Sequence, residues 1–381
     1  MSAPQSTVRY APAPAPAVLL NPGPVNVHPD VRAALGFPDV CHREPEVAAL
    51  IDRIRAKVVA VCGGGPEHRG VLLTGSGTAA LEATLGSIVP PDGKVLVLEN
   101  GHYGVRLAEI ATALGLPLRR LAFAWASPLD LAAIEATLAA DRSITHVAMV
   151  HHETSTGMLN PLREIGEICR RHGASLAVDA ISSLGSEALD VRLDGVDWCV
   201  GTANKCLEGL PGMSFVCAPE PLLRGLAGWP PRGYYLDLSR HFLAQEDLGA
   251  PAFTPAVQIA FAFERALDLT LAETVTARTA RYARRAEELR AGLADLGFRP
   301  LLESGEASGA VTVSHLPDGV TYEHLHDALK AAGFVVYATQ ARLGATVRIG
   351  TMGQLTEADI ARFLAALREA LPAPARVDRP A

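Results

Sequence analysis

Short apolar segments alternate with amphipathic segments of helical periodicity from about residue 46 to about residue 220, and this alternation constrains the fold more than any other feature. Parallel strands joined by crossover helices produce such a pattern, because helices cover both faces of the sheet. We therefore predict an α/β fold with a mainly parallel sheet flanked by helices. Strands are expected at 71–74, 94–98, 146–150, 174–178 and 197–201.

One helix of this region has clear start and stop signals. Asn160 is expected to cap it, Pro161 to be its first residue and Gly173 to end it, directly before the strand at 174–178. Proline is favoured at the first helical position, and glycine is favoured just after the last.

The pattern changes at about residue 275. We predict a large domain over 18–274 and a smaller C-terminal α+β domain over 275–371. Its expected elements are a long helix at 278–296, strands at 310–314, 334–337 and 346–349, a helix at 322–332 and a last helix opened by the capping pair Thr356 and Asp359.

Both ends of the chain are rich in proline, which fixes φ and lacks an amide donor. An Ala-Pro repeat lies within residues 1–17, and Pro and Ala recur over 372–381. These segments are therefore expected to be a flexible arm and a flexible tail.

Composition excludes several classes of protein. The chain has 381 residues, and 34 basic against 41 acidic residues give a net charge of −7 with neither sign gathered in blocks, so a nucleic-acid partner is not expected. The N-terminus shows no signal peptide and no apolar run is long enough to span a membrane, which predicts a cytoplasmic protein without a membrane partner. Six cysteines without a C-x-x-C pair indicate neither a zinc site nor disulfides.

A glycine-rich turn follows the first predicted strand. Residues 75–78 (Gly-Ser-Gly-Thr) precede a helix, and amides at a helix N-terminus bind phosphate well. The turn alone leaves three interpretations open. Gly75-x-Gly77-x-x-Ala80 with Glu99 fits a dinucleotide fingerprint, a phosphorylated cofactor or substrate would also fit, and the turn could be purely structural.

Asp179 and Lys205 follow two later strands and should open onto the same carboxyl edge of the sheet. A carboxylate and a lysine at strand ends, with a phosphate cradle nearby, are what pyridoxal 5′-phosphate requires. The lysine forms a Schiff base, and the carboxylate keeps the pyridine nitrogen protonated. A structural ion pair is the alternative.

Further polar and aromatic residues follow other strands of the sheet. Tyr103 offers a face for a flat ring, although a tyrosine in a loop is more often a packing residue. Thr154 offers a hydroxyl, which a capping role explains equally well. Arg348 lies in an apolar strand and needs either an internal carboxylate or the acid group of a substrate. His151 and His152 lack the helical spacing of a metalloprotease site, so we interpret them as structural and expect no metal.

A series of motifs in this order resembles the class V aminotransferases of the fold-type I superfamily over residues 18–371. The motifs are Leu20-Asn-Pro-Gly-Pro24, Gly75-Ser-Gly-Thr78, Asn100-Gly-His-Tyr-Gly104, His152-Glu-Thr-Ser-Thr-Gly-Met-Leu-Asn-Pro161, Val178-Asp-Ala-Ile-Ser-Ser183, Ala203-Asn-Lys-Cys-Leu-Glu-Gly-Leu-Pro-Gly212 and Arg348-Ile-Gly350. The resemblance removes the dinucleotide interpretation of the glycine-rich turn.

The resemblance implies a pyridoxal 5′-phosphate enzyme and gives roles to individual residues. Ser76, Gly77 and Thr78 would hold the phosphate of the cofactor. Tyr103 would stack on one face of the ring and Ile181 would pack on the opposite face, while Thr154 would contact the ring hydroxyl and Asp179 the ring nitrogen. Lys205 would form the Schiff base, with Asn204 beside it in the cofactor site. Lys205 and Asp179 are the implied catalytic residues. Thr254 would reach the phosphate from the partner subunit of a homodimer with active sites at its interface, and Arg348 would bind the acid group of the amine and 2-oxo acid substrates.

Within the superfamily, the likeness is to the branch that moves the amino group of 2-aminoethylphosphonate to pyruvate, with departures. His102 stands where a small residue is expected, Glu208 stands where that branch has glutamine, and residues 42–45 resemble the alanine–glyoxylate branch. We expect substrate contacts among these positions. An alanine– or serine–glyoxylate transaminase, a lyase on the same scaffold and, in another class, an NAD-dependent oxidoreductase are the alternatives.

Overall fold

The computed structural model describes residues 16–303 and 305–372. The predicted arm and tail therefore lie outside the described residues, apart from residues 16, 17 and 372. Among the residues described, no helix combines the length and the apolar character that a membrane span requires.

A seven-stranded sheet forms the centre of the larger part of the molecule, in the order β2-β10-β9-β8-β5-β3-β4. β10 runs antiparallel to both of its neighbours and the other adjacent pairs are parallel, which confirms the predicted mainly parallel sheet. The strands are β2 (His68–Thr74), β3 (Lys94–Glu99), β4 (Leu118–Ala122), β5 (Ile144–Val150), β8 (Ser175–Asp179), β9 (Trp198–Thr202) and β10 (Met213–Pro219).

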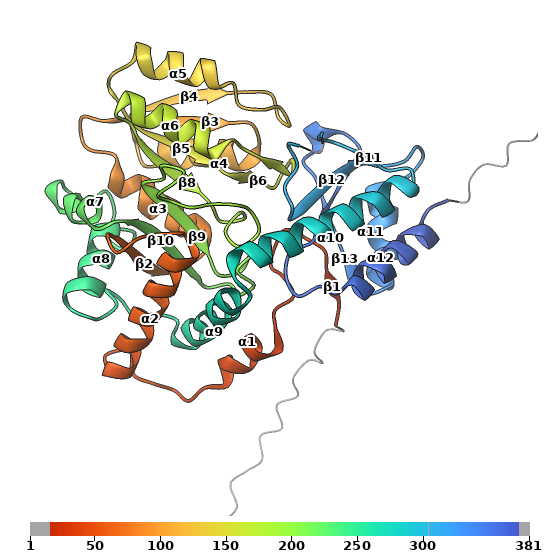
Figure 1. Cartoon of the computed structure of the whole chain (residues 1–381), viewed down its shortest axis with the longest axis horizontal. Coiled ribbons are helices and arrows are strands. Elements are labelled where there is room, and N and C mark those ends of the chain that lie inside the picture. The colour runs from red at the N-terminus through yellow and green to blue at the C-terminus, as the bar shows by residue number, and fades with distance from the viewer. Residues whose placement is uncertain (1–15, 304, 373–381) are drawn as a thin grey trace, which may run out of the picture.

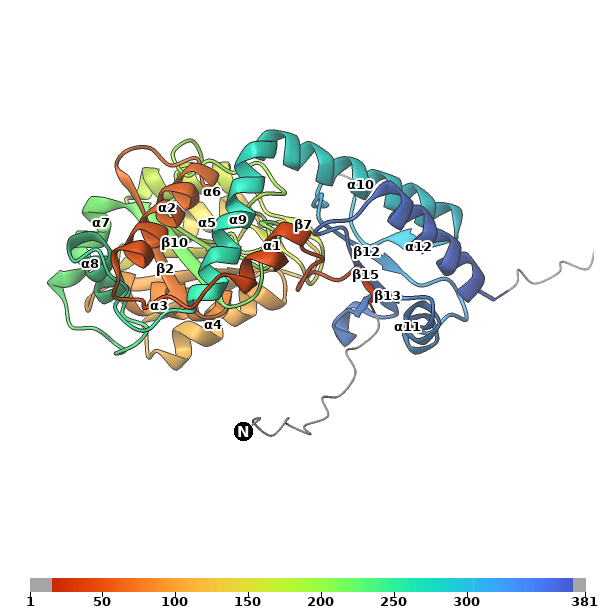
Figure 2. The same ribbon diagram turned by 90° about the horizontal axis from the view of Figure 1, so that it is seen from below.

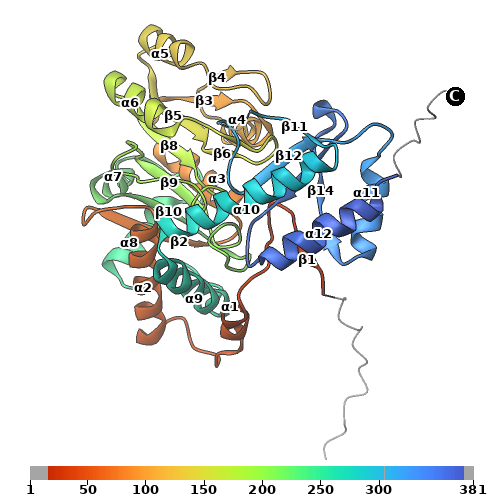
Figure 3. The same cartoon turned by 45° about the vertical axis from the view of Figure 1, so that its right-hand side comes forward.

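Helices cover both faces of this sheet (Figures 1 and 3). Successive residues of a strand point to opposite faces of the sheet, so each face has its own hydrophobic core. Leu72 packs with one group of helices, and its neighbour Val71 packs with the other. The first group is α2 (Pro45–Val61), α5 (Leu131–Ala140), α6 (Leu162–His172) and α9 (Val257–Glu273); the second is α3 (Gly77–Ile88), α4 (His102–Ala113), α7 (Glu220–Gly225) and α8 (Leu238–Asp247).

The start of α6 differs from the prediction by one position. Pro161 is the cap rather than the first helical residue, and Asn160 does not cap the helix. The Asn160 amide instead donates to the carbonyl of Val150 at 2.8 Å and bonds with the side chain of Asn100. A buried polar side chain needs hydrogen-bond partners, and Asn160 finds them in other segments of the chain rather than at the start of the helix. The end of the helix at Gly173, with φ +67°, is as predicted.

The C-terminal region folds around a four-stranded antiparallel sheet with the order β11-β12-β15-β14. Its elements are β11 (Arg299–Pro300), β12 (Val311–His315), β14 (Tyr337–Ala338), β15 (Thr346–Gly350), α10 (Val275–Asp295), α11 (Tyr322–Ala331) and α12 (Glu357–Ala370), the last opened by the predicted capping box. Figure 2 shows α10 running from the larger part of the molecule along these elements.

The N-terminal segment belongs structurally with the C-terminal region. Strand β1 (Val18–Leu19) pairs in parallel with β13 (Phe334–Val335), and Leu20 is buried in the C-terminal core. From there the chain passes through α1 (Pro29–Ala33) to α2. The boundary at residue 275 stays a prediction, but the first residues of the predicted large domain clearly contribute to both parts of the molecule.

Candidate active site

A cavity of about 190 Å³ opens at the carboxyl ends of β2, β5, β8 and β9, where ligands bind in open α/β sheets. Most of the predicted site residues line it, while Thr254 and Arg348 do not. The lining residues are Ser76, Gly77, Thr78, Leu81, Tyr103, Arg106, Val150, His152, Thr154, Asp179, Ile181, Ser182, Thr202, Asn204 and Lys205.

The glycine-rich turn lines the cavity with Ser76, Gly77 and Thr78. Ser76 caps α3, and its Oγ accepts a hydrogen bond from the amide of Ala79 at 3.4 Å. The first amides of a helix have no acceptor within the helix, so those of Gly77 and Thr78 are suited to an anion. A Cβ at Gly77 would lie 2.5 Å from Cδ1 of Ile181, which explains why glycine occupies this position.

Asp179 is buried and Lys205 is partly buried, and no ion pair joins the two side chains. Asp179 ends β8, and its Oδ1 accepts from the amide of Ile181 at 3.0 Å. Burial raises the pKa of Asp179 to about 7 and lowers the pKa of Lys205 to about 8. The pocket therefore disfavours both charged forms, and a positively charged group next to Asp179 would restore its carboxylate.

The N-terminal segment packs against Lys205. The Lys205 ammonium donates to the carbonyl of Pro22, and a Cβ at Gly23 would lie 2.6 Å from Cδ of the lysine. On its other side, a Cβ at Gly350 would lie 2.6 Å from the carbonyl oxygen of Asn21. The sequence motifs around residues 20–24, 205 and 348–350 therefore meet at one place, and their glycines permit the close approach.

Tyr103 owes its position to a buried carboxylate. Oε2 of Glu153 accepts from the amides of Tyr103 and Gly104 at 2.9 and 3.0 Å, which caps the start of α4 from outside the helix. Oε1 of Glu153 accepts from the amide and hydroxyl of Ser155. Sequence reasoning gave Glu153 no role, because its partners come from a distant helix.

His152 was interpreted as structural, and its position requires a correction. It lines the cavity, its Nδ1 lies 3.0 Å from the carbonyl of Ser182, and its buried Nε2 has no hydrogen-bond partner among the described residues. Burial lowers the pKa of His152 to about 3, so the ring is neutral. The residue lies two positions after the end of β5, so the strand-end rule that singled out Asp179 could also have found it.

The remaining predicted residues lie outside the cavity. Arg348 in β15 is 8% exposed and its Nη1 donates to the carbonyl of Thr154 at 3.1 Å, so it lies directly behind the cavity wall. Thr254 is exposed in the segment beside Tyr235. Glu208 does not contact the cavity, contrary to expectation, but forms an ion pair with Arg278 at 3.0 Å.

Comparisons with known proteins agree with the geometry of the site. The family model of the class V aminotransferases matches residues 32–363. The 2-aminoethylphosphonate–pyruvate transaminases of Syntrophobacter fumaroxidans and Klebsiella pneumoniae are 38% and 37% identical to the chain, covering 93% of it and 96% and 97% of their own lengths. The crystal structure of ureidoglycine–glyoxylate aminotransferase from Bacillus subtilis superposes with a TM-score of 0.90 at 27% identity, covering 95% of this chain and 94% of that one.

Proposed function

We propose that this chain, which belongs to the class V aminotransferases, uses pyridoxal 5′-phosphate to move the amino group of 2-aminoethylphosphonate to pyruvate, giving phosphonoacetaldehyde and L-alanine. The observation that carries the proposal is one cavity lined by Lys205 and Asp179, which follow or end adjacent strands, and by the first residues of α3. The substrate assignment is supported by relatives that are 36–38% identical to the chain and are named 2-aminoethylphosphonate–pyruvate transaminase.

The residues present fit the cofactor. Amides of Gly77 and Thr78 would hold its phosphate, while Tyr103 and Ile181 offer two apolar walls for its ring. Asp179, whose carboxylate has no cationic partner within ion-pair distance among residues 16–303 and 305–372, would bind the protonated ring nitrogen. When bound, pyridoxal 5′-phosphate would supply an electron sink for the carbon that bears the amino group.

Lys205 would attach the cofactor covalently and, once released by the substrate amine, act as general base and then general acid. Its Nζ would take a proton from the carbon that bears the amino group. The lowered pKa of about 8 makes the neutral amine available close to neutral pH. Asp179 would meanwhile hold the proton at the ring nitrogen, and Arg348 would orient the acid group of the substrate.

We also propose that the enzyme is a homodimer and that Thr254 acts on the phosphate of the partner subunit. Thr254 is exposed in the single chain and separate from the cavity, which is compatible with a role in the other protomer. Mixing Lys205→Ala protomers with Thr254→Ala protomers should restore activity, because a hybrid dimer holds one site with both residues intact. A mixture without any gain in activity would exclude action across the interface.

Two measurements test the cofactor and the donor separately. Borohydride reduction followed by peptide mapping should find a pyridoxyl group on Lys205 and none on the partly exposed Lys94. Single-turnover spectra with 2-aminoethylphosphonate, alanine and serine should then show the fastest loss of the visible cofactor band with the phosphonate. Faster loss with alanine or serine would replace the proposed donor while leaving the cofactor assignment intact.

A further inference from the structure

Two arginines beside the cavity are held by neutral groups. Arg106, in the first turns of α4, lines the cavity with its guanidinium 4.7 Å from the ring centre of Tyr103 and its Nη2 3.3 Å from Nε2 of His102. Arg348 donates to the carbonyl of Thr154, and its buried Nε has no partner among the described residues. Neither arginine lies within ion-pair distance of a carboxylate in the part of the chain that the structure describes.

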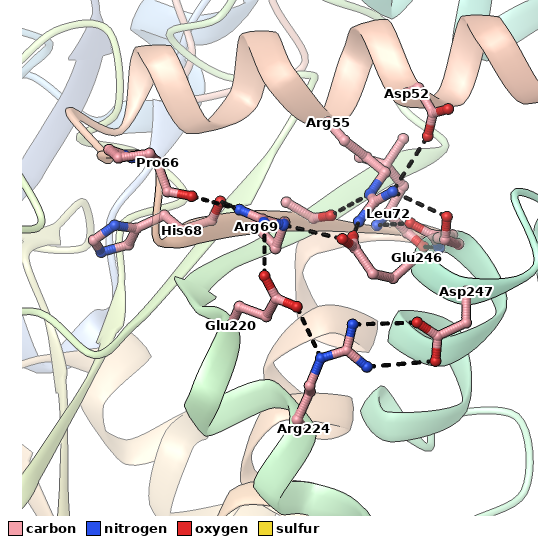
Figure 4. Close-up of polar contacts among 12 residues, drawn as sticks. Asp52, Arg55, Pro66, His68, Arg69, Leu72, Glu220, Arg224, Glu246 and Asp247 are labelled. Atoms are coloured by element: carbon pink, nitrogen blue, oxygen red, sulfur yellow. Dashed lines mark hydrogen bonds and ion pairs between the residues drawn. The ribbon is translucent and has the colours of Figure 1, made fainter.

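Several arginines elsewhere in this protein are instead paired with carboxylates. Figure 4 shows Arg69 between the carboxylates of Glu220 and Glu246, at 2.6 and 3.1 Å, and Arg224 bound to Glu220 at 2.8 Å. Such pairs neutralise the guanidinium. The charges of Arg106 and Arg348 are not neutralised in this way, so Arg106 in the cavity lining and Arg348 behind it would both attract an anion in the cavity.

The charges of Arg106 and Arg348 both affect the same two groups, Lys205 and His102. Burial is the main cause of the lowered pKa of Lys205, and the charges of Arg348 and Arg106 act in the same direction. The pKa of His102 is likewise lowered, first by burial and then by Arg106, with a contribution from Arg348. His102 is therefore a neutral acceptor for Arg106, and it fixes the guanidinium without cancelling its charge.

We propose that Arg106 is a second substrate-binding arginine and that it acts with Arg348 as a two-guanidinium site that selects a phosphonate over a carboxylate. This inference rests on the proposed function and assigns the donor specificity to a named residue. A phosphonate, like a phosphate, approaches two negative charges at neutral pH and offers three acceptor oxygens. One arginine satisfies a carboxylate through its two parallel N–H groups, whereas a phosphonate leaves an oxygen and a charge for a second arginine.

The test measures binding of two unreactive ligands, methylphosphonate and acetate, to the holoenzyme by titration calorimetry. In the proposed holoenzyme the phosphate of the cofactor would occupy the start of α3, so methylphosphonate would report the substrate position. Arg106→Gln should weaken methylphosphonate binding by about tenfold or more and acetate binding by less than about threefold, the range for loss of one charge-assisted hydrogen bond. The affinity of Arg106→Lys for methylphosphonate should lie between those of the wild type and Arg106→Gln, because lysine keeps the positive charge but lacks the planar guanidinium group.

Arg342→Gln is the matched control. Arg342 also lies over an aromatic ring, 4.5 Å from the ring centre of Trp125, but it is exposed and does not line the cavity. Its replacement should change both affinities by less than about twofold, because solvent screens the charge. Equal weakening of both ligands in Arg106→Gln, or no weakening of either, in a variant that keeps the visible cofactor band, would overturn the proposal.

The same experiment separates this inference from the proposed function. If the wild-type enzyme binds methylphosphonate through Arg106 but does not use 2-aminoethylphosphonate as a donor, only the proposed function fails. If it uses 2-aminoethylphosphonate and Arg106→Gln retains the wild-type KM for it, the two-arginine site fails and the proposed function stands.

Discussion

Asp179, which we propose binds the cofactor, opposes the stability of the cofactor-free protein at high pH. Its pKa is about 7 in the folded chain against 3.8 in the unfolded chain, chiefly because of burial. The folded state therefore binds more protons, and stability falls as the pH rises from about 4 to about 7. Above pH 7 the carboxylate is ionised in a buried site, which destabilises the cofactor-free protein.

Asp179→Asn should therefore raise the melting temperature of the cofactor-free protein at pH 8 but not at pH 4. The gain at pH 8 is on the order of a few kcal/mol, because asparagine keeps the hydrogen bond from Ile181 and removes the charge. Transamination should fall at least a hundredfold, because the ring nitrogen loses its anionic partner. Differential scanning calorimetry at the two pH values checks the first statement, and an equal gain at both pH values would contradict it.

Single residues of the candidate site could be predicted from the sequence where one structural rule was sufficient. Asp179 and Lys205 follow strands, and the sheet brings such positions to one edge. Arg106 was missed because it lies on a helix, four residues after His102, and an arginine in that position is usually solvated. Only the tertiary structure shows that it lines the cavity and that no carboxylate among the described residues lies within ion-pair distance of it.

At the scale of elements, the buried parallel strands were predictable and two other strands were not. β4 is half exposed and carries Arg119 and Arg120, so it lacks an apolar run. β10 lies between β2 and β9 and runs antiparallel to both, and nothing in its apolar sequence encodes a direction. Strand order depends on long-range pairing, which local periodicity does not report.

Helix α3 offers a test of close packing at its first residue. Gly77→Ala should weaken the affinity for pyridoxal 5′-phosphate by at least about tenfold, because the new Cβ would lie 2.5 Å from Ile181 and displace the turn or the apolar wall. Gly86→Ala in the same helix is the control. Its Cβ would meet Leu114 at 3.6 Å, an ordinary contact, and alanine should stabilise the helix by about 0.5–1 kcal/mol.

Titration of the visible cofactor band and thermal unfolding distinguish the two variants. Retention of wild-type cofactor affinity in Gly77→Ala would show that the turn has more room than its packing indicates. Loss of affinity in Gly86→Ala as well would assign the effect to the helix in general rather than to its first residue.

At the scale of the whole molecule, contacts between distant segments complete the site, and these were beyond sequence reasoning. The segment around Pro22 enters from the C-terminal region and covers Lys205, and Arg348 reaches Thr154 from a different sheet. Periodicity predicted many of the elements, but it carries no information on which elements meet. The motifs around residues 20–24 and 348–350 were recognisable only as a pattern shared with a family.

Glu208 was expected among the substrate contacts, but its position indicates a role in the stability of the whole fold. Its carboxylate, 3% exposed, binds Arg278 and Arg281 of α10 at 3.0 and 3.1 Å and accepts from the hydroxyl of Tyr282 at 2.8 Å, and the amide of Gln354 also donates to it. The residue therefore joins the loop after Lys205 to α10 and to the C-terminal region. Removing one partner of a buried pair leaves an uncompensated charge and costs about 3 kcal/mol.

Glu208→Gln should therefore lower the melting temperature and leave the ratio of KM values for 2-aminoethylphosphonate and alanine unchanged, because residue 208 does not line the cavity. The control is Glu135→Gln, whose exposed partner Arg171 lies at 2.8 Å and whose loss should hardly change the melting temperature, because solvent already screens the pair. Thermal unfolding and donor kinetics of the two variants measure both quantities. A change of donor preference in Glu208→Gln at unchanged stability would contradict the structural role, since it would require the side chain to act on the substrate across Arg278.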